Sequence, residues 1–276
     1  LNGNDNVSRS AILEALKIGS RSVLNEKEVP RLASELRDFY VKQGYFEAKV
    51  VAECRRGGDL CREVMLKISE GPLFVVGGAL LSGELGSEEK RLEKRLAKVK
   101  HQPSSESVLQ TLRLEILKAL RKKDYLQARV RVEYRDGGRE FEKLAAVDVD
   151  LGRPVYFSLS GNSFYSQKKL LTEAKVYDRE LPFGRNSIRL LAEAILELYR
   201  REGFADVSLT YQRAPGKSGE AEHYNIVIKE GARVRVEAVE LQGNNSLSTA
   251  KISQILKGKG KDQPQEFFSP TYLVLS

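Results

Sequence analysis

Tryptophan is absent from the 276-residue sequence, methionine occurs once and histidine twice. The two histidines, His101 and His223, form no His-x-x-x-His pair, so neither a zinc site nor a histidine-activated nucleophile is indicated. No apolar run approaches the roughly 18 residues of a membrane helix. A phosphate-binding glycine loop and a nucleophile elbow are also missing. We therefore expect no enzyme, no metal site and no cofactor.

Cysteine is nearly absent too. Cys54 and Cys61 are separated by six residues that include two glycines, and strand-like runs flank both. In a hairpin their Cα atoms would lie near the distance of about 5.5 Å that a disulfide requires. Two unrelated thiols are the alternative, and two cysteines are too few for a zinc site. A disulfide would imply an oxidising compartment.

The charge of the chain is moderate and spread along its length. Lys and Arg total 46 against 38 Asp and Glu, giving a formal charge of +8, and hydrophobic residues make up 41%. This composition is typical of globular proteins. The densest basic stretches, residues 90–100 and 118–123, have helical patterns, which favours solvated helix faces over a nucleic-acid or membrane surface. The first residues resemble no signal segment, and we expect a fragment of a longer chain.

An internal repeat of about 80 residues is the strongest signal present. A glycine followed by a polar residue recurs at spacings of 80, 78 and 82 residues, as Gly3-Asn4, Gly83-Glu84, Gly161-Asn162 and Gly243-Asn244. A second landmark recurs as GYFEAKV at 44–50, DYLQARV at 124–130 and GFADVSL at 203–209. A third closes each unit, as Glu70-Gly71-Pro72, Leu151-Gly152 and Glu230-Gly231. Three landmarks in one order predict four units, at 1–71, 72–152, 153–231 and 232–276.

Each unit follows a β-α-α-β-β pattern. In the third unit we expect Ser166 and Asn186 to cap the two helices and Gly203 to end the second one in a left-handed turn. In the first, Asn25 and Glu28 predict a capping box. The predicted fold class is α+β, with two helices covering one face of a three-stranded mixed sheet. The first strand of the first unit is mostly missing, and the fourth unit is truncated.

One RNA-binding fold shares this element order. Type I KH domains bind the phosphate backbone through a G-x-x-G loop between their two helices. The corresponding segments here, residues 18–26, 99–106 and 176–186, contain no such loop. An RNA-binding repeat protein is therefore the more distant alternative, and we expect no nucleic acid as a partner.

The landmarks together resemble the POTRA domains of the BamA/TamA outer-membrane β-barrel assembly and translocation superfamily. Residues 40–50 match that family's Tyr-x-x-x-Gly-Tyr-x-x-Ala-x-Val motif in full, and residues 68–72 match its Ile-x-Glu-Gly-Pro motif. The second unit departs, since Leu120 replaces the tyrosine and Asp124 the glycine, which leaves its turn geometry open. We expect structural roles for Gly44, Tyr45, Gly71, Tyr125, Gly161, Asn162, Gly203, Phe204, Gly231, Gly243 and Asn244.

The resemblance implies that the third strand is central, so the second strand of each unit lies at an edge of its sheet. A free edge presents unpaired N–H and C=O groups, to which an extended chain can add by β-augmentation. Blunting the edge against aggregation is an alternative role for the arginines there. The candidate residues for binding a polypeptide are Lys49, Val51, Glu53, Arg129, Arg131, Glu133, Ser208, Thr210 and Gln212.

The resemblance further implies a periplasmic location, attached to the outer membrane through a missing C-terminal β-barrel. The implied partners are unfolded outer-membrane proteins, periplasmic lipoproteins or chaperones, and that barrel. The function implied is capture of barrel precursors during outer-membrane protein assembly. A two-partner secretion or other translocation protein, or a division-type POTRA protein, would share the fold.

Overall fold

The computed structural model describes residues 1–19, 24–57, 60–178, 182–214, 221–234 and 251. The chain divides into two compact units, Leu1–Ala119 with Ala128–Leu151, and Leu120–Gln127 with Gly152–Ser276. The first unit holds the first two predicted repeats, and the short segment 120–127 groups with the third. The four predicted boundaries stay a prediction. Almost all of the fourth repeat, with Gly243 and Asn244, lies outside the described residues.

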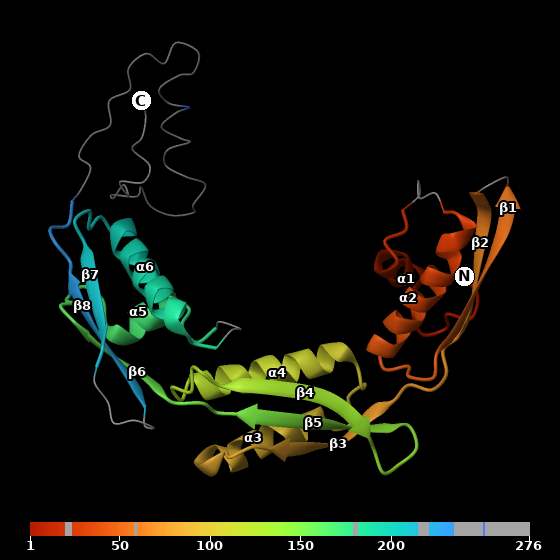
Figure 1. The fold of residues 1–276 in the computed structure, drawn as a ribbon, viewed down its shortest axis with the longest axis horizontal. Helices are drawn as coiled ribbons and strands as arrows, with labels where there is room; N and C mark the ends of the chain where they lie inside the picture. The colour runs from red at the N-terminus through yellow and green to blue at the C-terminus, as the bar shows by residue number, and fades with distance from the viewer. Residues whose placement is uncertain (20–23, 58–59, 179–181, 215–220, 235–250, 252–276) are drawn as a thin grey trace. The chain divides into compact units, whose positions relative to one another are not determined.

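The first repeat places two helices beside a β-hairpin (Figure 1). Its elements are α1 (Arg9–Ala15), η1 (Glu26–Glu28), α2 (Val29–Lys42), β1 (Lys49–Gly57) and β2 (Leu60–Ser69), and the two strands pair antiparallel. The predicted first strand is reduced to one parallel bridge between Asn2 and Lys67. The predicted capping box of Asn25 and Glu28 is present at the start of η1.

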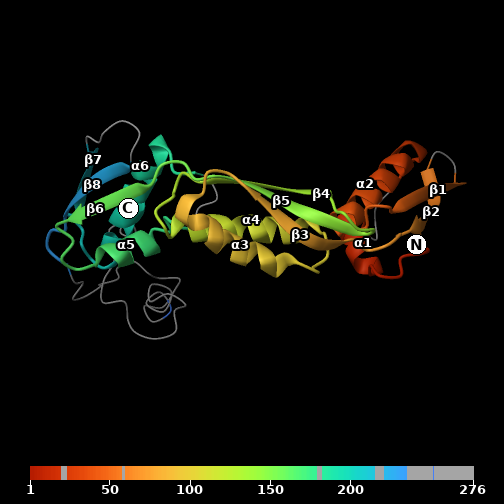
Figure 2. The same ribbon diagram turned by 90° about the horizontal axis from the view of Figure 1, so that it is seen from below.

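The second repeat contains a complete three-stranded mixed sheet. Its elements are β3 (Val75–Ser82), η2 (Gly86–Glu88), α3 (Glu89–Leu96), η3 (Ala97–Val99), α4 (Glu106–Arg121), β4 (Arg129–Asp136) and β5 (Glu142–Asp150). Their order is β3-β5-β4, with β3 parallel and β4 antiparallel to β5. Helices α3 and α4 lie on the same side of this sheet (Figure 2).

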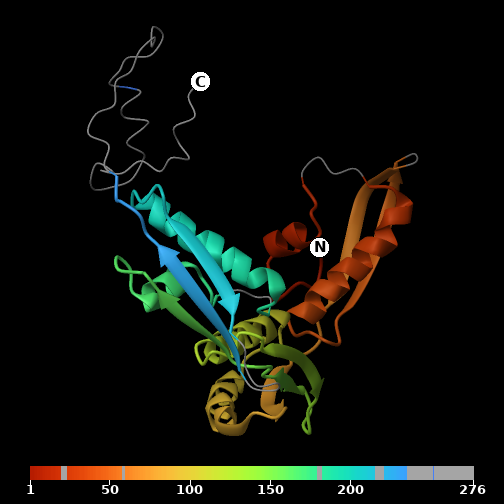
Figure 3. The same ribbon diagram turned by 60° about the vertical axis from the view of Figure 1, so that its left-hand side comes forward.

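The third repeat has the same topology. Its elements are β6 (Val155–Ser160), α5 (Gln167–Glu173), α6 (Arg185–Arg201), β7 (Ser208–Arg213) and β8 (Glu222–Lys229), in the order β6-β8-β7. Figure 3 shows α6, in teal, running alongside these strands, and its apolar stripe of Ile188, Leu191, Ile195 and Tyr199 belongs to the core. The fold class is therefore α+β, with mixed three-stranded sheets covered on one face, as the sequence predicted.

The caps of the third repeat confirm one prediction and correct another. The Ser166 side chain accepts a hydrogen bond from the Lys169 N–H and caps α5. Asn186 does not cap α6, because that helix already begins at Arg185. Instead, the Ser187 hydroxyl in the first turn accepts a hydrogen bond from the backbone N–H of Gly184, the residue before the helix, at 2.9 Å. Two polar residues so close together left the register of the cap undetermined in the sequence.

Tyr125 occupies the same motif position as Tyr45 and Phe204 but packs differently. Those two side chains are 8% and 6% exposed, whereas Tyr125 is only half-buried. The adjacent Leu126 is 2% exposed instead and packs in the core of the third repeat. Leu126 is the more apolar of the two side chains, and burying it gains more than burying a ring with a hydroxyl that needs a partner.

A left-handed turn follows the second helix of each repeat. Gly44, Asp124 and Gly203 have φ angles of +102°, +67° and +90°. The second repeat therefore keeps the turn geometry that its departure from the motif had left open. Asp124 adopts it although a side chain in this conformation is strained.

Replacing Asp124 with glycine is expected to stabilise the protein by about 1 kcal/mol, because glycine adopts a positive φ without strain. Burial also raises the pKa of the Asp124 carboxyl, so its ionised form is disfavoured in the fold. The protonated carboxyl therefore favours the folded state. This contribution to stability is complete below the pKa of Asp124 in the unfolded chain and is lost as the pH rises through its pKa in the folded chain. Asp124→Asn is the control, because it removes the charge and keeps the side chain. Thermal unfolding at pH 7 and at pH 4 measures the stability of both variants. If Asp124→Gly has the same stability as the original chain, the backbone strain at this position is contradicted.

Candidate functional site: free strand edges

The third strand of each complete repeat is the central one, so the second strand lies at an edge. In the orders β3-β5-β4 and β6-β8-β7, strands β4 and β7 each have a single neighbour, and β1 pairs only with β2. Among the described residues, no other backbone pairs with these three edges. Each edge therefore offers a row of N–H and C=O groups.

The opposite edges are partly covered. On β3, Val76 donates its N–H to the Gln102 carbonyl at 2.8 Å and accepts from the His101 N–H at 2.7 Å. On β6, the Gln167 side chain donates to the Phe157 carbonyl at 2.9 Å and accepts from the Leu159 N–H. Side chains and loop segments thus occupy part of each first-strand edge, while none of the described segments covers a second-strand edge.

The register shows which main-chain groups of β4 point away from the sheet. In an antiparallel pair, opposed residues alternate between exchanging hydrogen bonds and pointing outward. Gly137 donates to the Glu142 carbonyl directly opposite, at 3.1 Å, and no irregularity interrupts the register of β4 with β5. Counting in steps of two, Arg129, Arg131 and Glu133 are bonded to β5. The N–H and C=O groups of Val130, Val132 and Tyr134 therefore point to the free edge.

The other two edges follow the same rule. On β7, Ala214 donates to the His223 carbonyl opposite, so the outward groups belong to Leu209 and Tyr211. On β2, the Leu66 carbonyl and the Ile68 N–H face Asn2 rather than β1. The outward groups of β1 therefore belong to its core-facing residues, Val50 and Ala52. All three edges thus present their free groups at residues whose side chains point toward the helices.

This geometry changes the assignment made from the sequence. The predicted binding residues have solvent-facing side chains, but their own main-chain groups are bonded inside the sheet; they are Lys49, Val51, Glu53, Arg129, Arg131, Glu133, Ser208, Thr210 and Gln212. The residues with free main-chain groups are their neighbours. Side-chain and main-chain directions alternate with the same period of two, so the register of one hydrogen bond is needed to choose between them.

Exposed ion pairs lie on the solvent face of the first two sheets. Lys67 donates to Glu53 at 2.6 Å, and Arg135 lies 2.7 Å from Glu133. Exposed pairs of this kind contribute little to stability. Their effect here is to keep the solvent face polar without covering the main-chain groups at the edge.

Tyr134 anchors edge strand β4 on the helix side of its sheet. Its hydroxyl donates to the Ser105 carbonyl, just before α4, at 2.9 Å. Burial raises the pKa of Tyr134 to about 12, so the hydroxyl stays a hydrogen-bond donor at physiological pH. This hydrogen bond ties β4 to the segment before α4, so the backbone that carries the outward groups is fixed in place.

The hairpin of the first repeat contains a disulfide. Cys54 and Cys61 are bonded with Cα atoms 5.5 Å apart, which ties edge strand β1 to β2. Within the described residues there is no group of His, Cys, Asp and Glu side chains suited to a metal ion. A search of the same residues finds no helix long and apolar enough to cross a membrane.

The structure thus consists of tandem α+β repeats with open strand edges. Residues 1–71 match the POTRA family model, described as surface antigen variable number repeat. The predicted resemblance to POTRA domains is confirmed there, over the bounds of the first predicted repeat. No curated protein matches the chain.

Three of the solved structures that match this chain are the following. POTRA domains 3–5 of BamA from Haemophilus influenzae are 18% identical, with a TM-score of 0.42, over 82% of this chain and 91% of that one. The N-terminal domain of Omp85 from Thermosynechococcus elongatus is 11% identical, with a TM-score of 0.35, over 81% and 93%. CdiB from Escherichia coli is 14% identical, with a TM-score of 0.28, over 79% of this chain and 34% of that one.

Proposed function

We propose that this chain is the periplasmic polypeptide-binding region of an outer-membrane protein assembly or insertion factor. It captures unfolded barrel precursors by adding them as a further strand to its sheets. The observation that carries the proposal is the repeated open edge. In each of β1, β4 and β7, the outward main-chain groups belong to residues whose side chains point toward the helices of the same repeat. The POTRA match of the first repeat supports the same function.

The chemistry of the edge suits a receptor for many different chains. Main-chain hydrogen bonds recognise an extended backbone whatever its side chains, and barrel precursors are rich in extended segments of alternating polarity. Several edges in series allow one precursor to bind at more than one point, which raises its apparent affinity. The disulfide of the first repeat supports a periplasmic location, because disulfides persist in oxidising compartments. Periplasmic lipoproteins and chaperones are the further partners that we propose.

A ten-residue peptide with the alternating pattern of a barrel strand tests this function. Two versions are compared, each methylated on the backbone nitrogen of alternate residues, so that each loses the donors of one edge only. Strand addition predicts that one version binds and the other does not, because only one edge of the peptide faces the sheet. Calorimetric titration of the full chain measures both affinities. Equal binding of the two versions would contradict strand addition.

A further inference from the structure

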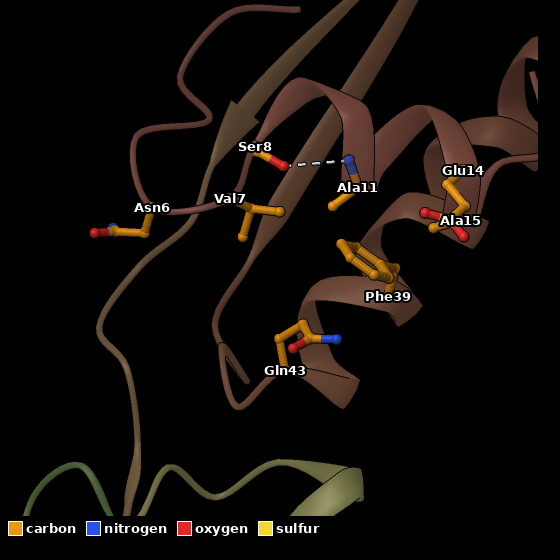
Figure 4. A pocket seen from close by; sticks show the side chains of 8 residues that line it. All are labelled: Asn6, Val7, Ser8, Ala11, Glu14, Ala15, Phe39 and Gln43. Carbon is orange, nitrogen blue, oxygen red and sulfur yellow. Dashed lines mark hydrogen bonds between the residues drawn. The ribbon is translucent and has the colours of Figure 1, made fainter.

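The first repeat has an open pocket on its helical side, away from the strand edges. It lies between α1 and the C-terminal turn of α2 and has a volume of about 460 Å³. Its walls are Asn6, Val7, Ser8, Ala11, Glu14, Ala15, Phe39 and Gln43. Figure 4 shows the Phe39 ring beneath Ala11, with Val7 to one side of the ring and Gln43 below it. An apolar floor with a few polar groups around it is typical of a binding pocket.

The third repeat shows what belongs in this space. The two repeats align through identical hydrogen bonds: Asn4 donates to the Val7 carbonyl as Asn162 does to the Tyr165 carbonyl. The next residue caps the first helix in both, by accepting from the Ala11 N–H in one repeat and from the Lys169 N–H in the other. Val7 therefore corresponds to Tyr165, and Ala11 to Lys169.

In the third repeat the equivalent space is filled by the Tyr165 ring. Tyr165 is 8% exposed and packs edge-to-face on Tyr199, with ring centroids 5.2 Å apart. Lys169 places its Nζ 4.6 Å from the centre of the Tyr165 ring. Burial, and then the nearby Glu202 carboxylate at the end of α6, raise the pKa of the Tyr165 hydroxyl to about 12. The ring thus spans the gap from the start of α5 to the end of α6.

The first repeat keeps the surroundings of this ring but lacks the ring. Tyr40 stands at the position of Tyr199, and Gln43 at the position of Glu202. Val7 and Ala11 are too small to cross the gap. The pocket therefore opens where Tyr165 and Lys169 stand in the third repeat, and its floor is Phe39 rather than the fully buried Tyr40.

We propose that this pocket binds the side chain of a tyrosine from a partner polypeptide. The ring would lie on Phe39, and its hydroxyl would meet the Gln43 amide, which stands at the position of Glu202. Glu14 lies on the exposed rim, and the structure shows no ion pair for it among the described residues. It favours a basic residue next to the tyrosine. Aromatic anchors in pockets of this kind dominate protein–protein binding.

The test uses the full 276-residue chain and N-acetyl-L-tyrosinamide as the probe. Titration followed by amide NMR is expected to give saturable shifts at Ala11, Ala15 and Gln43. N-acetyl-L-alaninamide is expected to give none, because the ring supplies the apolar contact. Acetyl-Lys-Tyr-amide is expected to bind more tightly than acetyl-Glu-Tyr-amide, because of Glu14.

Two variants fill the pocket from within. Val7→Tyr restores the ring of the third repeat, and Ala11→Lys fills the mouth from the exposed face of α1, where folding is least disturbed. Both are expected to weaken binding of the probe by roughly tenfold or more, since its ring then stays in water. Val132→Pro, at an edge strand, is expected to leave the probe's affinity unchanged, which separates this site from strand addition. Unaltered shifts in both filled variants, or equal shifts with the alanine probe, would overturn the proposal.

Discussion

Replacing Val132 with proline is expected to weaken binding of an extended peptide at β4 by about five- to tenfold, with the second repeat still folded. The N–H of Val132 points to the free edge, so proline removes a docking donor without removing a hydrogen bond to β5. Edge strands tolerate proline at such positions. One lost hydrogen bond of about 1 kcal/mol, with the bulk of the ring at the docking face, accounts for the expected factor.

Two matched variants make the result specific. Val132→Ala shortens the same side chain and keeps the N–H, so it is expected to bind peptide normally. Arg131→Pro shifts the proline by one residue, removes a bond of the ladder to β5 and is expected to destabilise the sheet instead. Val130 has the same backbone orientation as Val132 but is 8% exposed in the core, which makes it the less clean choice.

Because three edges share the geometry, binding is best followed at β4 itself, by the NMR shifts of its amides. The triple variant Ala52→Pro, Val132→Pro, Tyr211→Pro extends the test to all edges and is expected to abolish capture in bulk measurements. Peptide shifts at β4 that persist in Val132→Pro would show that the outward main chain is not the docking surface.

The fold could be predicted from the sequence because the same motifs occur three times in the same order, and each copy supports the interpretation of the others. Three helix ends and three closing glycines in phase fixed the element order, and the resemblance placed the third strand at the centre. The sequence could not show which main-chain N–H and C=O groups of an edge strand point out of the sheet. The alternation in β4 shows that Val130 and Arg131 differ, but a hydrogen bond such as Gly137 to Glu142 is needed to say which of them is free.

The closing motif shows a second limit of sequence reasoning. Its glycine was expected to have a structural role, and Gly231 adopts a left-handed φ of +73°. The glutamate before it received no role, although its carboxylate accepts hydrogen bonds from residues distant in the sequence. Glu230 is 31 residues from Tyr199 in the sequence, and only folding brings the two together. Both residues belong to recognised motifs, but nothing in the spacing shows that the motifs meet.

This pairing is the same in the first and third repeats. The Tyr40 hydroxyl donates to Glu70 at 2.9 Å, and the Tyr199 hydroxyl donates to Glu230 at 2.8 Å. Each carboxylate also accepts a backbone N–H from the loop before the first helix, at 2.8 Å from Phe164 in the third repeat. Both tyrosines are fully buried. The second repeat has leucine at both positions, Leu120 and Leu151, so the polar pair is replaced as a unit.

Glu230→Leu is expected to destabilise the third repeat by about 3 kcal/mol, because it leaves the buried Tyr199 hydroxyl and the Phe164 N–H without their acceptor. The double variant Tyr199→Leu, Glu230→Leu copies the second repeat and is expected to recover part of this loss, since the unpaired hydroxyl is gone. Hydrogen exchange of the α6 and β8 amides measures the local stability of this repeat. Additive losses in the two single variants and the double variant would contradict the coupling.

The same pair predicts a pH dependence. Burial, and then the hydrogen bond to Glu230, raise the pKa of Tyr199 well above its usual value. A group whose folded pKa is raised contributes stability that is full below its unfolded pKa, about 10 for tyrosine. That stability is lost as the pH rises through the folded pKa, because ionisation places a phenolate beside a carboxylate. The third repeat is therefore expected to lose exchange protection above pH 10, and Tyr199→Phe to lose less over the same range, although it is weaker at pH 7. An equal alkaline loss in Tyr199→Phe would assign the transition to other groups and remove the buried pair as its cause.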